Sequence, residues 1–149
     1  MIYLIPILFL IYFIFQKQPL NFSFDNIFLF ILALIFATVL TFVFDFVIGL
    51  GAFWVQDVKT ITDFHDIFYF VLSGKVIPLG VLPTAIQIVN DFLPFRYMLS
   101  FPAEIILGNL NLENIILGFC VQIFWIILMT FLYIFMWRKG LKRYSAYGA

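Results

Sequence analysis

The sequence predicts an all-α membrane protein with about four transmembrane helices and a re-entrant helical hairpin before the last one. Hydrophobic residues make up 65% of the 149 residues and charged residues only 11%. Soluble domains are usually about half apolar and about a quarter charged. The apolar residues are also grouped in runs, two of which exceed the roughly 20 residues that a membrane-spanning helix needs. A third feature, a proline-interrupted apolar stretch between two of these runs, predicts the hairpin.

Residues 1–15 are predicted to form a short first span. The apolar run MIYLIPILFLIYFIF ends before Gln16 and is shorter than the roughly 20 residues of an ordinary span. No basic region precedes it and no small-residue cleavage site follows it, which argues against a signal peptide. One explanation is a short or tilted helix. The other is that the chain begins partway through a larger membrane protein.

Residues 26–56 form the clearest predicted span, and because they are longer than a perpendicular helix requires, the helix should tilt or protrude. Small and polar residues recur along it at intervals of four: Ala33, Ala37, Thr41, Asp45 and Gly49. Small residues let helices approach closely in lipid. A charge at the centre of a span costs about 2.5–3.5 kcal/mol on insertion scales, so Asp45 should face protein or water. Thr41, Asp45 and Gly49 are therefore candidates either for a packing face or for a polar transport path.

Residues 57–78 are predicted to form an amphipathic span. Four polar residues fall close to one helical face: Lys59, Asp63, Asp66 and Ser73. In one interpretation this face lines a water-accessible bundle interior, which makes Asp63 and Asp66 candidate pathway residues. In the other, the stretch is a solvated turn at the inner surface that enters the membrane at Ile67.

Residues 79–108 are predicted to form a pair of short re-entrant helices. Prolines, which kink helices and remove a backbone donor, recur in and beside this stretch at Pro78, Pro83, Pro94 and Pro102. The apolar runs 81–90 and 95–107 are each too short to span. Irregular backbone at membrane depth is tolerated only where protein or water satisfies it. We therefore expect the pair to dip into the outer leaflet and close one side of a polar cavity, with Pro94 at the turn; the alternative is an amphipathic external cap.

Residues 113–138 form the last predicted span, followed by a cytoplasmic tail at 139–149. Basic residues cluster at this junction: Arg138, Lys139, Lys142 and Arg143. By the positive-inside rule they place the C-terminus in the cytoplasm. The predicted inner turn gives the rule no support, because Lys59 lies between Asp57 and Asp63. The orientation therefore rests on the tail alone.

No catalytic or cofactor site is predicted. The Gly-Lys pair at 74–75 lacks the upstream glycine and the following Ser or Thr of a phosphate-binding loop. Asp63, His65 and Asp66 are better explained as a polar helix entry than as metal ligands. Cys120 is the only cysteine and has no internal disulfide partner. A net charge of zero gives no indication of a nucleic-acid partner.

Several short elements of the broken stretch occur in a recognisable order. A Gly-x-x-x-Pro element, a Leu-Pro pair and a Pro-Phe-x-Tyr element are formed by Gly74, Pro78, Leu82, Pro83, Pro94, Phe95 and Tyr97, with Pro102 farther along. This order resembles the paired re-entrant helices before the last span of type-two ABC transporter permeases. The segments GAFWVQDV at 51–58 and WRKGLKRYSAYGA at 137–149 resemble one bacterial subfamily. The resemblance covers 49–149 closely and earlier residues by hydropathy only.

The resemblance implies the permease subunit of an ATP-driven ABC transporter of the bacterial plasma membrane, usually an exporter, that forms part of the substrate pathway. It implies as partners a separate ATP-binding cassette ATPase subunit, a second permease copy or companion permease, and membrane lipid. Such a permease has no catalytic residues and binds no cofactor, so the chain is not expected to be an enzyme.

The family has about six spans, and this chain would supply the last four. The main cytoplasmic coupling helix would lie upstream of Met1, so we expect a fragment, a truncated gene product or half of a split permease. The alternative is a stand-alone membrane interaction or scaffold protein without transport activity. The residues do not indicate the substrate.

Overall fold

A computed structural model describes residues 24–55 and 58–145, and every regular element in this part of the chain is a helix. The α-helices and 3₁₀ helices are α2 (Phe24–Leu50), η1 (Gly51–Phe53), α3 (Val58–Leu72), η2 (Leu79–Val81), α4 (Thr84–Asn90), α5 (Pro94–Met98), α6 (Ser100–Ile106) and α7 (Leu112–Ser145). The all-α prediction is confirmed for these residues. The predicted first span at 1–15 lies outside them.

Two helices of the described chain are long and apolar enough to cross a membrane, over Asn26–Phe53 and Leu112–Leu141. At 1.5 Å per residue, α2 with its 27 residues and α7 with its 34 extend about 40 Å and about 51 Å, beyond a hydrocarbon core of about 30 Å. The 15 residues of α3 extend only about 22 Å. The prediction of four spans is thus supported for two helices by length and composition, and it stays a prediction for the other two.

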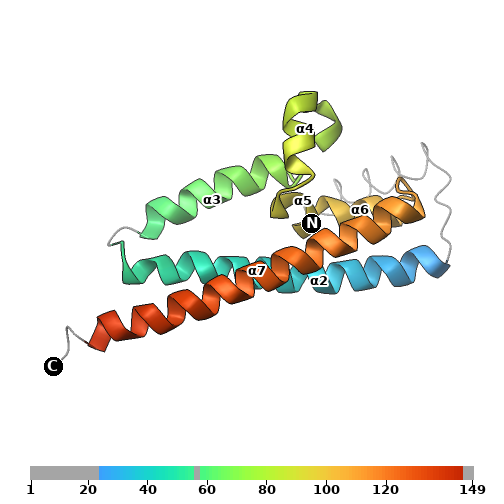
Figure 1. The fold of residues 1–149 in the computed structure, drawn as a ribbon. Helices are drawn as coiled ribbons and strands as arrows, with labels where there is room; N and C mark the ends of the chain where they lie inside the picture. Colours follow the sequence, from blue (N-terminus) through green and yellow to red (C-terminus); the bar gives the residue numbers. More distant parts are fainter. Residues whose placement is uncertain (1–23, 56–57, 146–149) are drawn as a thin grey trace, which may run out of the picture.

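The helices α2 and α7 lie against each other and run in the same direction (Figure 1). The ring centroids of Phe36 and Phe119 are 6.0 Å apart, and those of Phe46 and Tyr133 are 5.9 Å apart. Residue numbers therefore increase in the same direction along both helices at the contact, as expected for a parallel pair. Two parallel helices in one chain need a return path between them, and this path consists of α3 and of residues 73–108, which we call the broken segment.

The return path is divided between two neighbouring pieces. α3 lies beside the C-terminal half of α2, where the His65 ring is 5.1 Å from the Phe44 ring. The helices α5 and α6 pack against α2 and α7 farther along, and the rings of Phe101 and Phe119 are 5.5 Å apart. Figure 1 shows α3 ending partway along the pair and α6 continuing towards the start of α7. The return path therefore consists of α3 followed by several short helices and contains no single continuous helix.

The core forms where α2, α5, α6 and α7 meet. Its buried hydrophobic residues are Ala33, Leu40, Tyr97, Met98, Phe101, Ile105, Ile115 and Met129. The outward faces of the long helices are equally apolar but open, because Phe42, Ile127 and Phe131 are each more than 60% exposed. Apolar surface of this extent is unusual on a soluble monomer and suits contact with lipid.

A tight turn sets the start of α7. Gly108 has a φ of 69°, a conformation that glycine adopts without steric cost. Its N–H donates to Ile105 O at 3.0 Å, and the N–H of Asn109 donates to Glu104 O at 3.1 Å, which is the Schellman pattern of a helix C-terminus. Asn111 then accepts the Asn114 N–H on Oδ1 at 3.0 Å and caps α7. The broken segment and α7 are thereby joined by only a few residues.

Candidate functional site

The stripe of small and polar residues on α2 divides into a packed part and an open part. Ala33 and Ala37 are buried. Thr41 donates its hydroxyl to Ala37 O within the same helix at 2.9 Å. Asp45 and Gly49 are exposed and line a groove of about 390 Å³ together with apolar neighbours on α2. Close helix packing therefore uses the N-terminal half of the stripe, and the polar Asp45 lies in the open half.

The candidate acidic residues of α3 are exposed. Neither Asp63 nor Asp66 is covered by neighbouring helices, and Asp66 Oδ1 is 3.3 Å from His65 Nδ1. The side of α3 that faces protein carries Ile61, His65 and Tyr69 instead. Asp45 and Asp66 lie near enough for their like charges to interact. The described chain thus brings Asp45 and Asp66 into one neighbourhood.

Side chains of α7 hold the broken segment in place. Gln122 is fully buried, and its Nε2 donates to Ala33 O and to Tyr97 O, each at 3.0 Å. One turn farther along, Trp125 Nε1 donates to Phe92 O at 2.8 Å. Gln122 therefore links α2, α5 and α7 at one point. Backbone carbonyls outside continuous helix are costly at membrane depth unless protein or water satisfies them, and these two side chains supply the donors.

The broken segment also binds the end of α3. Asn90 donates from Nδ2 to Leu72 O at 2.9 Å, and Ser100 donates from Oγ to Ser73 O at 2.5 Å. Both acceptors are carbonyls at the C-terminus of α3, where helical partners run out. The predicted residue Gly74 follows with a φ of 81°, and a Cβ there would overlap Ser100. This turn therefore requires glycine both for its backbone and for its space.

All four predicted prolines lie at or just before helix starts. Pro78 and Pro83 immediately precede η2 and α4, and Pro94 is the first residue of α5. Pro102 lies in the first turn of α6. The missing N–H of proline is not needed in a first turn. The ring of Pro102 would clash with the carbonyl four residues earlier in a continuous helix, which explains why the run 95–107 is divided at Leu99 into α5 and α6.

The two aromatic residues of the predicted motif anchor α5. The Phe95 ring lies 5.7 Å from the Phe44 ring on α2. Tyr97 is buried and donates its hydroxyl to Asp91 O at 2.7 Å. Each therefore connects the start of α5 to a different neighbour: Phe95 to the long helix, and Tyr97 to the loop that follows α4.

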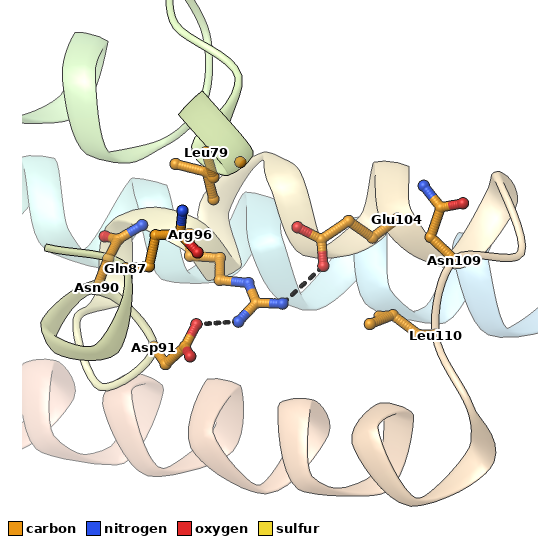
Figure 2. Close-up of a pocket in the computed structure, with 9 residues that line it drawn as sticks. Leu79, Gln87, Asn90, Asp91, Arg96, Glu104, Asn109 and Leu110 are labelled. Carbon is orange, nitrogen blue, oxygen red and sulfur yellow. Dashed lines mark hydrogen bonds and ion pairs between the residues drawn. The ribbon is translucent and has the colours of Figure 1, made fainter. Parts of the chain in front are cut away.

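Arg96 stands between two carboxylates in a polar hollow, which we call the Arg96 cavity (Figure 2). Its Nη1 pairs with Asp91 and its Nη2 lies 2.7 Å from Glu104 Oε2. The cavity has a volume of about 410 Å³ and is also lined by Gln87, Asn90 and Asn109. A second hollow of about 250 Å³ shares Asp91 and Arg96 and reaches Gly118 on α7. Arg96 thus forms part of the wall between the two hollows.

The electrostatics of this site favour a charged guanidinium. Burial alone would lower the pKa of Arg96, but the hydrogen bond and charge of Glu104, with the charge of Asp91, raise the pKa above its ordinary value. The described residues contain no group of three or more His, Cys, Asp or Glu side chains arranged to hold a metal ion. The cavity is therefore lined by a charged guanidinium and two carboxylates that can bind a polar group.

Sequence reasoning did not single out Gln122, Trp125, Asn90 or Gly118. A signal was available for Gln122, which is an amide within the apolar run 113–138, where polar side chains usually bond across helices. Gly118 carries no such signal. A Cβ at this position would overlap the Phe101 ring, a fact that depends on how α6 packs on α7.

Comparison with known proteins gives one family for the chain. A family model described as ABC-2 family transporter protein matches residues 1–148. No curated protein and no solved structure matches the chain.

Proposed function

This chain belongs to the ABC-2 transporter family, and from that premise we propose that it is the membrane-spanning permease subunit of an ATP-driven ABC exporter. It forms part of the substrate pathway, and a separate ATP-binding cassette subunit hydrolyses ATP. Membrane permeases of this family are typically non-catalytic. The substrate pathway needs a second permease copy or a companion permease beside this chain.

The anchoring of the broken segment is the observation that carries the proposal. Side chains of α7 donate to its carbonyls at Tyr97 and Phe92. Its own Asn90 and Ser100 donate to carbonyls at the end of α3, so an irregular, polar structure is anchored at one end of an apolar helix pair. Lipid alone gives no reason to maintain such a structure, because a continuous helix would satisfy its own backbone at no cost in polar side chains. A transporter has a reason, since it must close one side of a polar pathway.

We propose that this end of the pair faces the cell exterior. The opposite end of α7 carries Arg138 and Lys139, with two more basic residues in the following turn, and the positive-inside rule assigns that end to the cytoplasm. The broken segment is then the re-entrant pair. Asp45, Thr41 and Gly49 on α2, with Asp63 and Asp66 on α3, lie nearer the cytoplasmic end and are the proposed polar residues of the pathway.

Copurification with ATPase activity tests the transporter function. The tagged full chain, isolated from native membranes in mild detergent, should bring with it a nucleotide-binding subunit and vanadate-sensitive ATP hydrolysis. Gly118→Leu should abolish this activity by displacing Phe101, whereas Ile127→Leu, on the open outward face of α7, should keep the complex assembled. Isolation of the folded chain without any ATP-hydrolysing partner would favour the scaffold alternative.

Single cysteines test the orientation in a Cys120→Ser background. Asn111→Cys, in the turn before α7, should react with a charged thiol reagent in intact cells. Ser145→Cys, at the end of α7, should react only after permeabilisation. Gly80→Cys and Asn109→Cys should behave like Asn111→Cys, because a re-entrant pair returns to the side it came from. Labelling of Gly80→Cys from the cytoplasm alone would refute the re-entrant arrangement without affecting the family assignment.

A further inference from the structure

The charged side chains that line the Arg96 cavity have a net negative charge. Two carboxylates, Asp91 and Glu104, face one guanidinium, so the group carries a formal charge of one negative unit. Glu104 is mostly buried, with 23% of its side chain exposed, while Asp91 is about half exposed. A net negative charge in a partly enclosed hollow attracts cations more strongly than the same charge would in open water.

Acceptor oxygens of the lining are also left without donors, although Arg96 Nε is buried without a partner among the described residues as well. Asn90 and Gln87 use their amide nitrogens on the backbone carbonyls of Leu72 and Leu82, at 2.9 Å and 2.7 Å. The Gln87 amide oxygen remains as an acceptor, whereas Asn90 Oδ1 is buried and has no partner among the described residues. Arg96 directs Nη1 and Nη2 at the carboxylates, each of which keeps a second oxygen.

The chemistry of a matching ligand follows from these two observations. An anion would meet two carboxylates and a guanidinium whose terminal nitrogens are already engaged. A metal ion would need a denser ligand set than the described residues provide. A primary ammonium group is positively charged and carries three N–H donors, which matches an excess of acceptor oxygens and a net negative charge. The cavity volume of about 410 Å³ lies in the range of small-molecule sites.

We propose that the Arg96 cavity binds a primary ammonium group, with the second carboxylate oxygens of Asp91 and Glu104 and the amide oxygen of Gln87 as its acceptors. The group belongs either to a lipid head group or to a soluble amine, since the cavity is open at one end of the helix pair. This binding is separate from the proposed transport function. It requires no ATPase subunit, and it can be measured on the chain alone.

Two probes of equal charge test the proposal on the purified full chain in phosphatidylcholine nanodiscs. Butylammonium has three N–H donors, and butyltrimethylammonium has none. Isothermal titration calorimetry should show binding of butylammonium and at least about tenfold weaker binding of butyltrimethylammonium, because charged hydrogen bonds are lost. Equal affinity for the two probes, or no binding of either, would overturn the proposal.

Three variants locate the site. Glu104→Gln should weaken butylammonium binding by about tenfold or more, because it removes the excess charge, and Asp91→Asn should act in the same direction. Glu113→Gln is the matched control, because Glu113 is an exposed carboxylate on α7 outside the cavity. Unchanged binding in both cavity variants refutes the site. If neither variant folds, the comparison of the two probes on the wild-type chain decides.

The source of the ammonium group is distinguished in a separate arm. Phosphatidylethanolamine in the nanodiscs should raise the unfolding temperature of the wild-type chain above that in phosphatidylcholine, and it should compete with butylammonium if the ligand is a lipid. No such rise, with butylammonium binding retained, would identify a soluble amine as the ligand. The Glu104→Gln chain should show no difference between the two lipids.

Discussion

The α2–α7 pair and the broken segment lie against each other, yet different forces hold them. Within α2 and α7 the backbone satisfies itself, and the contact between the helices consists mainly of aromatic rings and of small residues such as Ala33 and Ala37. The broken segment instead depends on side chains of other elements, among them Gln122 and Trp125. The comparison shows that the polar side chains of the apolar helix α7 are needed where this helix faces the irregular backbone of the broken segment.

This contrast predicts that substitutions at the broken segment cost more than equivalent ones on the pair, and the largest effect is expected at Gly74. Gly74→Ala should lower the free energy of unfolding by about 3 kcal/mol or more, because it combines left-handed backbone strain with a clash against Ser100. Gly80→Ala is the control, since a Cβ there meets nothing within 4 Å. Thermal unfolding in detergent measures both. Equal losses in the two variants would show that the turn at Gly74 is not fixed.

Gly118 should give the next largest effect. Gly118→Ala places a Cβ into the Phe101 ring and should cost about 1–3 kcal/mol through overpacking. Gly49→Ala on α2 meets open space and should gain up to about 1 kcal/mol from helix propensity. The two changes are chemically identical, so opposite signs in unfolding temperature are the expected result. A gain in both variants would mean that α6 does not pack on α7 at this position.

Loss of the Gln122 hydrogen bonds should give the third largest effect. Gln122→Leu keeps the side-chain size but removes the donor to Ala33 O and Tyr97 O, and it should cost about 1–2 kcal/mol. Thr38→Val is the matched control, because the Thr38 hydroxyl donates only to Leu34 O of its own exposed helix face. Limited proteolysis of the broken segment should accelerate in Gln122→Leu alone. Unchanged proteolysis would show that α7 does not anchor the segment.

Trp125 should give the smallest effect. Trp125→Phe removes one hydrogen bond, to Phe92 O, while keeping an aromatic ring, and an interhelical hydrogen bond of this kind is worth about 0.6 kcal/mol. Trp54→Phe serves as the control, since Trp54 is exposed and its ring packs on Phe53, outside the broken segment. The difference between the two unfolding temperatures is the measurement. A larger loss in Trp54→Phe would contradict the anchoring role of Trp125.

The long helices could be predicted from the sequence, because apolar runs and polar turns mark them directly. The predicted spans 26–56 and 113–138 correspond to α2 at Phe24–Leu50 with η1, and to α7 at Leu112–Ser145. The last helix is longer than predicted because the basic residues after Trp137 continue it. Hydropathy ends a span at the first charges, whereas a helix continues for as long as its backbone bonds can form.

The broken segment could be predicted only in outline. Its prolines indicated interrupted helices, and all four lie in or next to helix first turns. Its anchors could not be predicted, because the bond from Gln122 to Ala33 O joins residues 89 positions apart and carries no local pattern. The same holds for Arg96 and Glu104. Their charges are visible in the sequence, but their pairing depends on how α6 packs against α5.

The position of Gln122 late in the chain has a consequence for biogenesis. Tyr97 leaves the ribosome 25 residues ahead of Gln122, a delay of about 1–5 s at ordinary rates of synthesis. During that interval the carbonyl of Tyr97 has no donor from α7, and lipid supplies none. The broken segment must therefore wait in water or in the insertion machinery until the last helix arrives, so that α7 closes the structure of the segment that precedes it.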